Sequence, residues 1–111
     1  MQAKIRTEGP VEILELSGKI TIGEGEGDLR QVVQELVEGG RRKILISLER
    51  VGFMDSAGLG ELVACYKRAT EKGGTIKLLR PSGKVKDLLS LTKITEIFEI
   101  FDDEGEAIAS F

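Results

Sequence analysis

The chain has 111 residues, of which 41% are hydrophobic and 32% are charged, and its formal net charge is −3. This length and composition are typical of one folded domain, residues 1–111, and the low aromatic content means that Ile, Leu and Val must form most of the core. The negative charge gives no overall attraction to nucleic acid or to anionic membranes. One cysteine excludes an internal disulfide, and the lack of histidine removes the commonest metal ligand and the usual general base. We therefore predict a protein that is not an enzyme and needs no cofactor or metal.

The N-terminal part of the chain predicts a β-hairpin. Apolar and polar residues alternate over residues 4–7 and 11–16, and Glu8-Gly9-Pro10 between them has the chemistry of a turn. The opening residues contain no apolar block of a signal peptide, and no run reaches membrane-spanning length. We expect a cytoplasmic protein that does not contact membranes or bind nucleic acid directly.

A glycine-rich acidic loop and a helix follow the hairpin. After the turn at Ser17-Gly18, residues 19–22 predict a short extended piece, and residues 23–28 carry three glycines and three carboxylates. Asp28 and Gln31 have the spacing of a capping box, and Gly39-Gly40 marks the end of the helix. One buried helical face is predicted by the spacing of Leu29, Val32, Val33, Leu36 and Val37.

The second half of the chain alternates predicted strands and helices. The apolar run 44–48 suits a central strand, residues 75–79 and 97–101 predict two more strands, and helices are expected after each strand. The second helix places Glu61 largely away from its apolar side, whereas Cys65 lies on the border of that side and is expected to be a small buried hydrophobe. This order predicts an α/β fold with a mixed, mostly parallel sheet of about four to five strands, an N-terminal hairpin and four helices.

The stretch 51–62 is the strongest candidate for a functional site. It follows the central strand, and Asp55 can cap the second helix by accepting hydrogen bonds from its free N–H groups. Ser56 then takes the first helical position, with its hydroxyl outward at the positive end of the helix. Functional positions in open α/β sheets gather where strand ends meet helix N-termini, so we single out Ser56 as the residue most suited to phosphorylation.

Two other motifs favour ordinary structural roles. The loop Gly23-Glu24-Gly25-Glu26-Gly27 lies where a dinucleotide-binding turn would, but Asp28 replaces the third glycine and the carboxylates would repel a pyrophosphate. Asp55 could be the phosphoacceptor of a receiver domain, but the first hairpin lacks the acidic cluster that would hold the metal. We therefore interpret the glycine loop as a mobile acidic loop that caps a helix, and Asp55 as a helix cap.

The run Phe53-Met54-Asp55-Ser56-Ala57-Gly58-Leu59-Gly60 resembles the signature of the STAS domain, the family of bacterial anti-sigma factor antagonists. The resemblance extends along nearly the whole chain and implies a STAS fold. It also implies that an anti-sigma factor with serine kinase activity phosphorylates Ser56, that the unphosphorylated form binds this partner and frees the sigma factor, and that a serine phosphatase restores it. The site residues implied are the phosphorylated Ser56, the cap Asp55, and a contact surface of Met54, Asp55, Ser56, Ala57, Gly58, Leu59 and Gly60.

Two positions differ from the usual family pattern. Ser47 stands where many members carry an aspartate at the end of the central strand, and the acidic glycine loop replaces a segment that often holds an aspartate before Thr or Ala. Both are expected near the partner surface.

Two alternatives remain open from the sequence. One is a non-switching STAS subunit of a stressosome-like signalling scaffold or of a lipid-transport complex, which would form large assemblies, whereas a switch protein should be a monomer or weak dimer. The other is a nucleotide-binding protein or enzyme of similar layout, which nucleotides would stabilise against heat.

Overall fold

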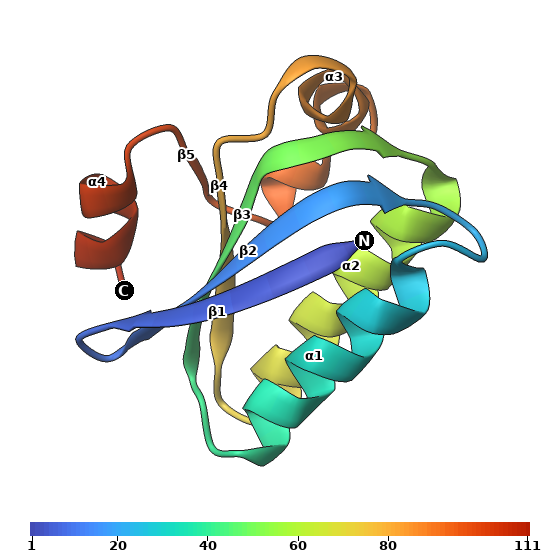
Figure 1. Cartoon of the computed structure of the whole chain (residues 1–111). Helices are drawn as coiled ribbons and strands as arrows, with labels where there is room; N and C mark the ends of the chain where they lie inside the picture. The colour runs from blue at the N-terminus through green and yellow to red at the C-terminus, as the bar shows by residue number, and fades with distance from the viewer.

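The computed structural model describes residues 1–111, which form five strands, four α-helices and one short 3₁₀ helix. Figure 1 shows the sheet with α1 and α2 on one face and α4 on the other. The elements in chain order are β1 (Gln2–Glu8), β2 (Val11–Ile20), α1 (Glu26–Glu38), β3 (Lys43–Met54), α2 (Ser56–Glu71), β4 (Thr75–Leu79), α3 (Gly83–Leu91), η1 (Ile94–Glu96), β5 (Ile100–Phe101) and α4 (Glu104–Ala109).

The strands form one mixed sheet in the order β1-β2-β3-β4-β5. β1 and β2 pair antiparallel, as the predicted hairpin requires, and every other neighbouring pair is parallel. The predicted α/β fold with a mostly parallel sheet, an N-terminal hairpin and four helices is confirmed. None of the helices has the length and apolar character needed to span a membrane.

The sheet separates two apolar clusters. The larger has 21 buried residues and fills the space between the sheet and the helices α1, α2 and α3. The smaller has five buried residues, Val11, Ile13, Leu45, Leu79 and Ala107, and lies under α4. Both clusters consist mainly of Ile, Leu and Val, as the composition predicts.

A buried lysine anchors the C-terminal helix to the sheet. Lys77 of β4 donates from Nζ to the backbone oxygen and the hydroxyl of Ser110, both at 2.8 Å. The same Nζ lies 4.8 Å from the ring centroid of Phe111 and 5.8 Å from that of Phe101, and it forms an ion pair with Glu99. These contacts give the buried charge hydrogen-bond acceptors and two aromatic faces, and they hold the chain's last residues against the sheet.

Two predicted strands are longer in the structure. β2 does not end at the Ser17-Gly18 turn but continues to Ile20, and β3 runs past the apolar residues 44–48 to Met54. Irregular pairing explains both differences, because the register between β2 and β3 shifts near Ser17 and again between Gly18 and Lys19. Polar residues at these irregular positions interrupt the apolar pattern without ending the strands.

Two smaller predictions are wrong. Helix α1 begins at Glu26 with Gly25 as its N-cap in a left-handed conformation, so Asp28 lies inside the helix and forms no capping box. A side chain at Gly25 would clash with the Lys19 backbone oxygen, which explains the glycine there. The last strand contains only Ile100 and Phe101, because Ile97 and Phe98 donate their backbone N–H groups to the Ile94 carbonyl in the turn that follows η1.

Candidate functional site

Asp55 joins three segments of the chain at the N-terminus of α2. Its Oδ1 accepts a hydrogen bond from the Gly58 N–H at 2.9 Å, and its Oδ2 accepts one from the Ile22 N–H at 3.0 Å. Its own N–H donates to the Ile20 carbonyl at 3.3 Å. Asp55 therefore occupies the cap position that the sequence predicts, and it also fastens the loop after β2 to the start of α2.

These hydrogen bonds lower the pKa of the Asp55 carboxyl below its ordinary value. The bond from the Ile22 N–H makes the largest contribution, and the bond from the Gly58 N–H follows. Both bonds favour the carboxylate over the protonated acid. Asp55 is therefore charged at neutral pH, next to Ser56.

We expect Asp55 to make folding stability depend on pH in acid. Since its pKa is lower in the folded chain than in the unfolded chain, its stabilisation is complete above about pH 4, the unfolded value, and is lost as the pH falls through the folded value. Melting temperatures from pH 7 to pH 2 should show the wild type more stable than Asp55→Asn at neutral pH, with a difference that shrinks in acid. Asp87→Asn is the control, since Asp87 is exposed on α3 and its side chain has no partner. A constant difference between wild type and Asp55→Asn would contradict the prediction.

Ser56 is exposed at the first position of the sixteen-residue helix α2. Its hydroxyl makes no hydrogen bond to the rest of the chain. The first-turn N–H groups and the helix dipole create a positive potential around it. A hydroxyl that is free, exposed and placed at a positive helix end can accept a phosphoryl group without breaking an existing contact.

Gly58 lets α2 approach the end of β2 closely. A Cβ atom at this position would lie 2.0 Å from the Ile20 carbonyl oxygen and 2.9 Å from Cγ of Met54. Gly60 is different, because a Cβ atom there would meet nothing within 4 Å. The first glycine is therefore required by packing, whereas the second is exposed and open.

The structure divides the predicted contact surface into exposed and buried residues. Ser56 and Gly60 are exposed, and Ala57 and Leu59 are half-buried. Met54 is only 4% exposed and packs in the larger apolar cluster, and Gly58 is also buried. The assignment of Met54 and Gly58 to the contact surface is corrected accordingly: they support the start of α2 from beneath.

Two exposed apolar residues on the segments that meet at Asp55, Ile22 and Phe53, are absent from the predicted contact surface. Ile22 is 75% exposed and Phe53 is 40% exposed. Lys84 of α3 places its Nζ 5.8 Å from the centroid of the Phe53 ring. The irregular register at the end of β3 puts Phe53 opposite Lys19 and leaves Met54 to fill the core. The only sign in the sequence that Ile22 could belong to the site is that it is an apolar residue next to the glycine-rich acidic loop 23–28.

Ser47 does not belong to this site. The prediction that it ends the central strand is wrong, because β3 continues for seven more residues to Met54. Ser47 is buried in the middle of β3, where it pairs with Glu15 and Leu79. At about 3.3 Å per residue, it lies roughly 20 Å from the end of the strand, so it does not reach the surface around Ser56.

A buried carboxylate fixes the orientation of α2 relative to α1. Glu61 accepts from Arg30 of α1 at 2.8 Å and from Arg68 at 3.1 Å, contrary to its predicted position away from the apolar side. Cys65 is completely buried next to Glu61, with its thiol 3.5 Å from the carboxylate. Burial, followed by the charge of Glu61, raises the pKa of Cys65 to about 12. The thiol is therefore a small buried group, as predicted, and not a nucleophile.

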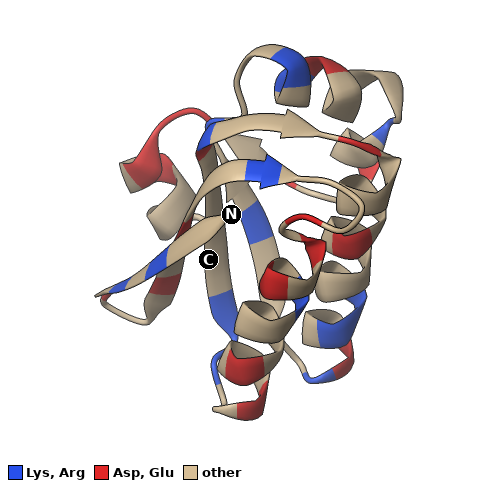
Figure 2. Cartoon of the chain, turned by 45° about the vertical axis from the view of Figure 1, so that its right-hand side comes forward, with Lys and Arg blue, Asp and Glu red and all other residues tan.

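Charged residues of both signs are spread over the helices and strands (Figure 2). No group of three or more Cys, Asp or Glu side chains is arranged so that it could hold a metal ion. The segments around Asp55 thus carry an exposed hydroxyl, that of Ser56, and two exposed apolar side chains, those of Ile22 and Phe53. The fold and the site together define a small α/β domain with a mixed sheet and an exposed serine at the start of the helix that follows β3.

The chain belongs to the STAS domain family, whose model matches residues 2–107. Among curated proteins it is similar to the anti-sigma F factor antagonist of Paenibacillus polymyxa, with 28% identity over 97% of this chain and 92% of the relative. A solved structure of an anti-sigma-factor antagonist (STAS) domain protein from Planctomyces limnophilus has a TM-score of 0.83 at 25% identity, covering 97% of this chain and 96% of the other.

A third similarity concerns the fold alone. The Bacillus cell fate determinant SpoIIAA in its phosphorylated form has a TM-score of 0.74 at 20% identity, covering 98% of each chain. The same protein has also been solved in its unphosphorylated form. The membership suggested by the residues around Ser56 is therefore confirmed for the family and for the STAS fold.

Proposed function

We propose that this chain is an anti-sigma factor antagonist controlled by phosphorylation of Ser56. The unphosphorylated form binds an anti-sigma factor that is also a serine kinase, and this binding releases the sigma factor. Phosphorylation of Ser56 by the same partner ends the binding, and a serine phosphatase restores the active form. The observation that carries the proposal is the exposed Ser56 hydroxyl, which has no partner within the chain at the positive end of α2.

The chemistry of the site supports a switch that leaves the fold intact. A phosphate adds about 1.5 to 2 negative charges at neutral pH. The helix N-terminus favours such a charge by about 0.3 to 1 kcal/mol, while the neighbouring Asp55 carboxylate opposes it. Since no hydrogen bond of the fold involves the Ser56 hydroxyl, its modification removes no structural contact.

The exposed apolar residues support a protein partner. Ile22 is bonded to Asp55 through its backbone N–H, Phe53 precedes Asp55 by two residues, and with the half-buried Leu59 they give the segments around Ser56 exposed apolar groups. Burial of apolar side chains around a polar centre is typical of protein interfaces. In this proposal the partner covers these residues and brings its kinase site to Ser56. The curated relative from Paenibacillus polymyxa supports the choice of partner, because its name gives its target as an anti-sigma F factor.

The proposal is tested by locating the phosphate. We expect that incubation with the anti-sigma factor kinase of the same bacterium and ATP, followed by tandem mass spectrometry, places one phosphate on Ser56. The variant Ser56→Ala should bind the kinase and remain unmodified. Ser82, which directly precedes α3, and Ser90, which lies in α3, are also exposed and therefore act as internal controls. A phosphate found on either of them, with Ser56 unmodified, would refute the proposal.

A further inference from the structure

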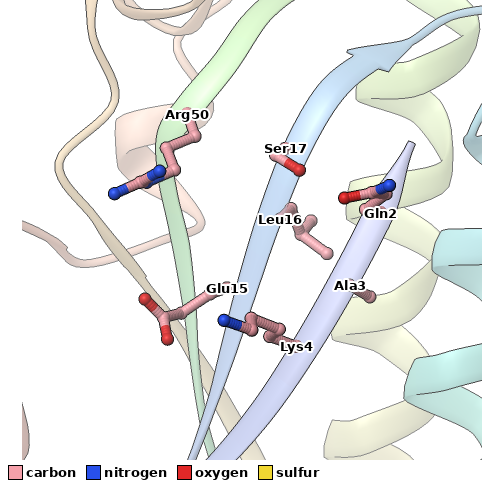
Figure 3. Close-up of a pocket in the computed structure, with 7 residues that line it drawn as sticks. All are labelled: Gln2, Ala3, Lys4, Glu15, Leu16, Ser17 and Arg50. Atoms are coloured by element: carbon pink, nitrogen blue, oxygen red, sulfur yellow. The ribbon is translucent and has the colours of Figure 1, made fainter.

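The face of the sheet opposite α1 and α2 carries an open hollow of about 510 Å³ over β1, β2 and β3. Helix α4 covers another part of this face, where the smaller apolar cluster lies. Figure 3 shows that Gln2 and Lys4 lie on β1, Glu15 and Ser17 on β2 and Arg50 on β3, and that the side chains of Glu15 and Arg50 extend past β3 on the side away from β1. The hollow is separate from the surface around Ser56, and none of its residues belongs to the proposed switch.

An extra residue in β3 brings Arg50 to the hollow. Glu15 of β2 pairs with Ser47, but two residues later Ser17 pairs with Arg50, so β3 advances by three residues where β2 advances by two. The extra residue of such a bulge shifts the alternation of side chains by one position, so that Arg50 points to the same face as Ser17. Arg50 therefore lies beside Ser17 on the open face, while Leu48 and Val51 are both buried.

The antiparallel pairing of β1 completes the group. Gln2 lies opposite Ser17, and Lys4 lies opposite Glu15. Directly opposed residues in a sheet point to the same face. The amide of Gln2, the ammonium of Lys4, the hydroxyl of Ser17 and the guanidinium of Arg50 therefore lie on the same face of the sheet.

These four side chains have no partner within the chain. Gln2, Lys4, Ser17 and Arg50 make no side-chain hydrogen bond or ion pair, although most arginines of the chain are paired. Glu15, the one acid of the hollow, accepts a hydrogen bond from Arg6 Nε at 3.2 Å. Three other acids, Glu8, Glu49 and Glu104, also form ion pairs with arginines.

Glu8 and Glu104 form ion pairs with Arg6, and Glu49 forms one with Arg80. Lys4 and Arg50 therefore form no ion pair, although the Glu15 carboxylate, which shares Arg6 with Glu8 and Glu104, lies in the same hollow. The hollow is thus lined by two cations without ion pairs, two neutral hydrogen-bonding groups and one carboxylate, so its cations outnumber its acid.

The geometry points to a binding site for a small molecule that carries a phosphate group. The planar guanidinium of Arg50 can donate two parallel hydrogen bonds to phosphate oxygens, and Lys4 adds a compact positive charge. The Gln2 amide and the Ser17 hydroxyl can bind further phosphate oxygens or hydroxyl groups attached to them. Small-molecule sites usually measure about 300 to 1,000 Å³, so the hollow has room for an organic group beside the phosphate.

The test is an NMR titration of the ¹⁵N-labelled chain at low ionic strength, where exposed charges are little screened. Inorganic phosphate and ribose 5-phosphate are added in separate experiments. We expect saturable shifts of the amide signals of Lys4, Ser17 and Arg50. The variants Arg50→Gln and Lys4→Gln should each weaken binding by about tenfold or more, because each removes a charge-assisted hydrogen bond.

The control variant is Lys86→Gln, which removes an exposed, unpaired lysine from α3. It should bind both ligands like the wild type, and all variants should keep the wild-type melting temperature. Tighter binding of ribose 5-phosphate than of phosphate supports recognition of a phosphorylated metabolite, and equal affinity supports recognition of the phosphate group alone. Shifts that do not saturate, shifts centred on the start of α2, or equal losses in Arg50→Gln and Lys86→Gln would overturn the inference. These results do not depend on Ser56, so they leave the proposed switch unaffected.

Discussion

The variant Gly58→Ala is expected to lower the free energy of unfolding by about 2 to 3 kcal/mol. The added methyl group would lie 2.0 Å from the Ile20 carbonyl oxygen and 2.8 Å from its carbon, so the start of α2 must move away from β2. For a domain of this size the change corresponds to a fall in melting temperature of roughly 10 °C, which differential scanning calorimetry measures directly.

Gly60→Ala is the matched control for this prediction. It makes the same chemical change two residues later in the same helix, at an exposed position where a Cβ atom meets nothing within 4 Å. Since alanine favours helix over glycine by about 1 kcal/mol, this variant should be slightly more stable than the wild type. Equal effects of the two substitutions would mean that close packing at Gly58 does not determine the start of α2.

Phosphoserine at position 56 is expected to weaken binding to the anti-sigma factor by roughly a hundredfold or more. A partner that covers Ile22, Phe53 and the start of α2 must bury the phosphate beside the Asp55 carboxylate. Placing like charges together in an interface costs several kcal/mol, and each 1.4 kcal/mol corresponds to about tenfold in affinity. Phosphoserine incorporated during translation by stop-codon suppression gives a homogeneous protein for calorimetric titration with the purified partner.

Two controls separate this effect from a general effect of charge. Phosphoserine at Ser90, exposed on α3, adds the same charge away from the site and should leave the affinity unchanged. Ser56→Ala should also bind like the wild type, because the hydroxyl itself has no partner in the fold. If phosphoserine at position 56 and at position 90 weakened binding equally, the switch would not depend on the site around α2.

The sequence predicted best those features that depend on residues close to one another in the chain. β4 has the predicted bounds, Thr75–Leu79, and the predicted apolar face of α1 is buried at Leu29, Val33, Leu36 and Val37. Asp55 could be predicted as a cap because capping involves only the few residues that follow it. These features depend on contacts that are close in the sequence.

The features that escaped prediction depend on distant segments or on irregular strand pairing. Glu61 is buried because Arg30, on a different helix, offers a partner, and no spacing within α2 indicates this. The exposure of Phe53 and the burial of Met54 follow from the shifted register between β2 and β3. The importance of Ile22 becomes clear only when its N–H is found bonded to Asp55, thirty-three residues later.

The position of the C-terminal residues has a practical consequence for labelling. Because Lys77 holds the end of the chain against the sheet, Phe111 lies on the face opposite α1 and α2, as Figure 1 shows. A fluorophore or affinity tag attached after Phe111 would therefore leave the molecule on the other side of the sheet from the larger apolar cluster that supports the start of α2. Surface immobilisation through this end would leave Ser56 open to a partner in solution, whereas attachment at the start of α2 would obstruct it.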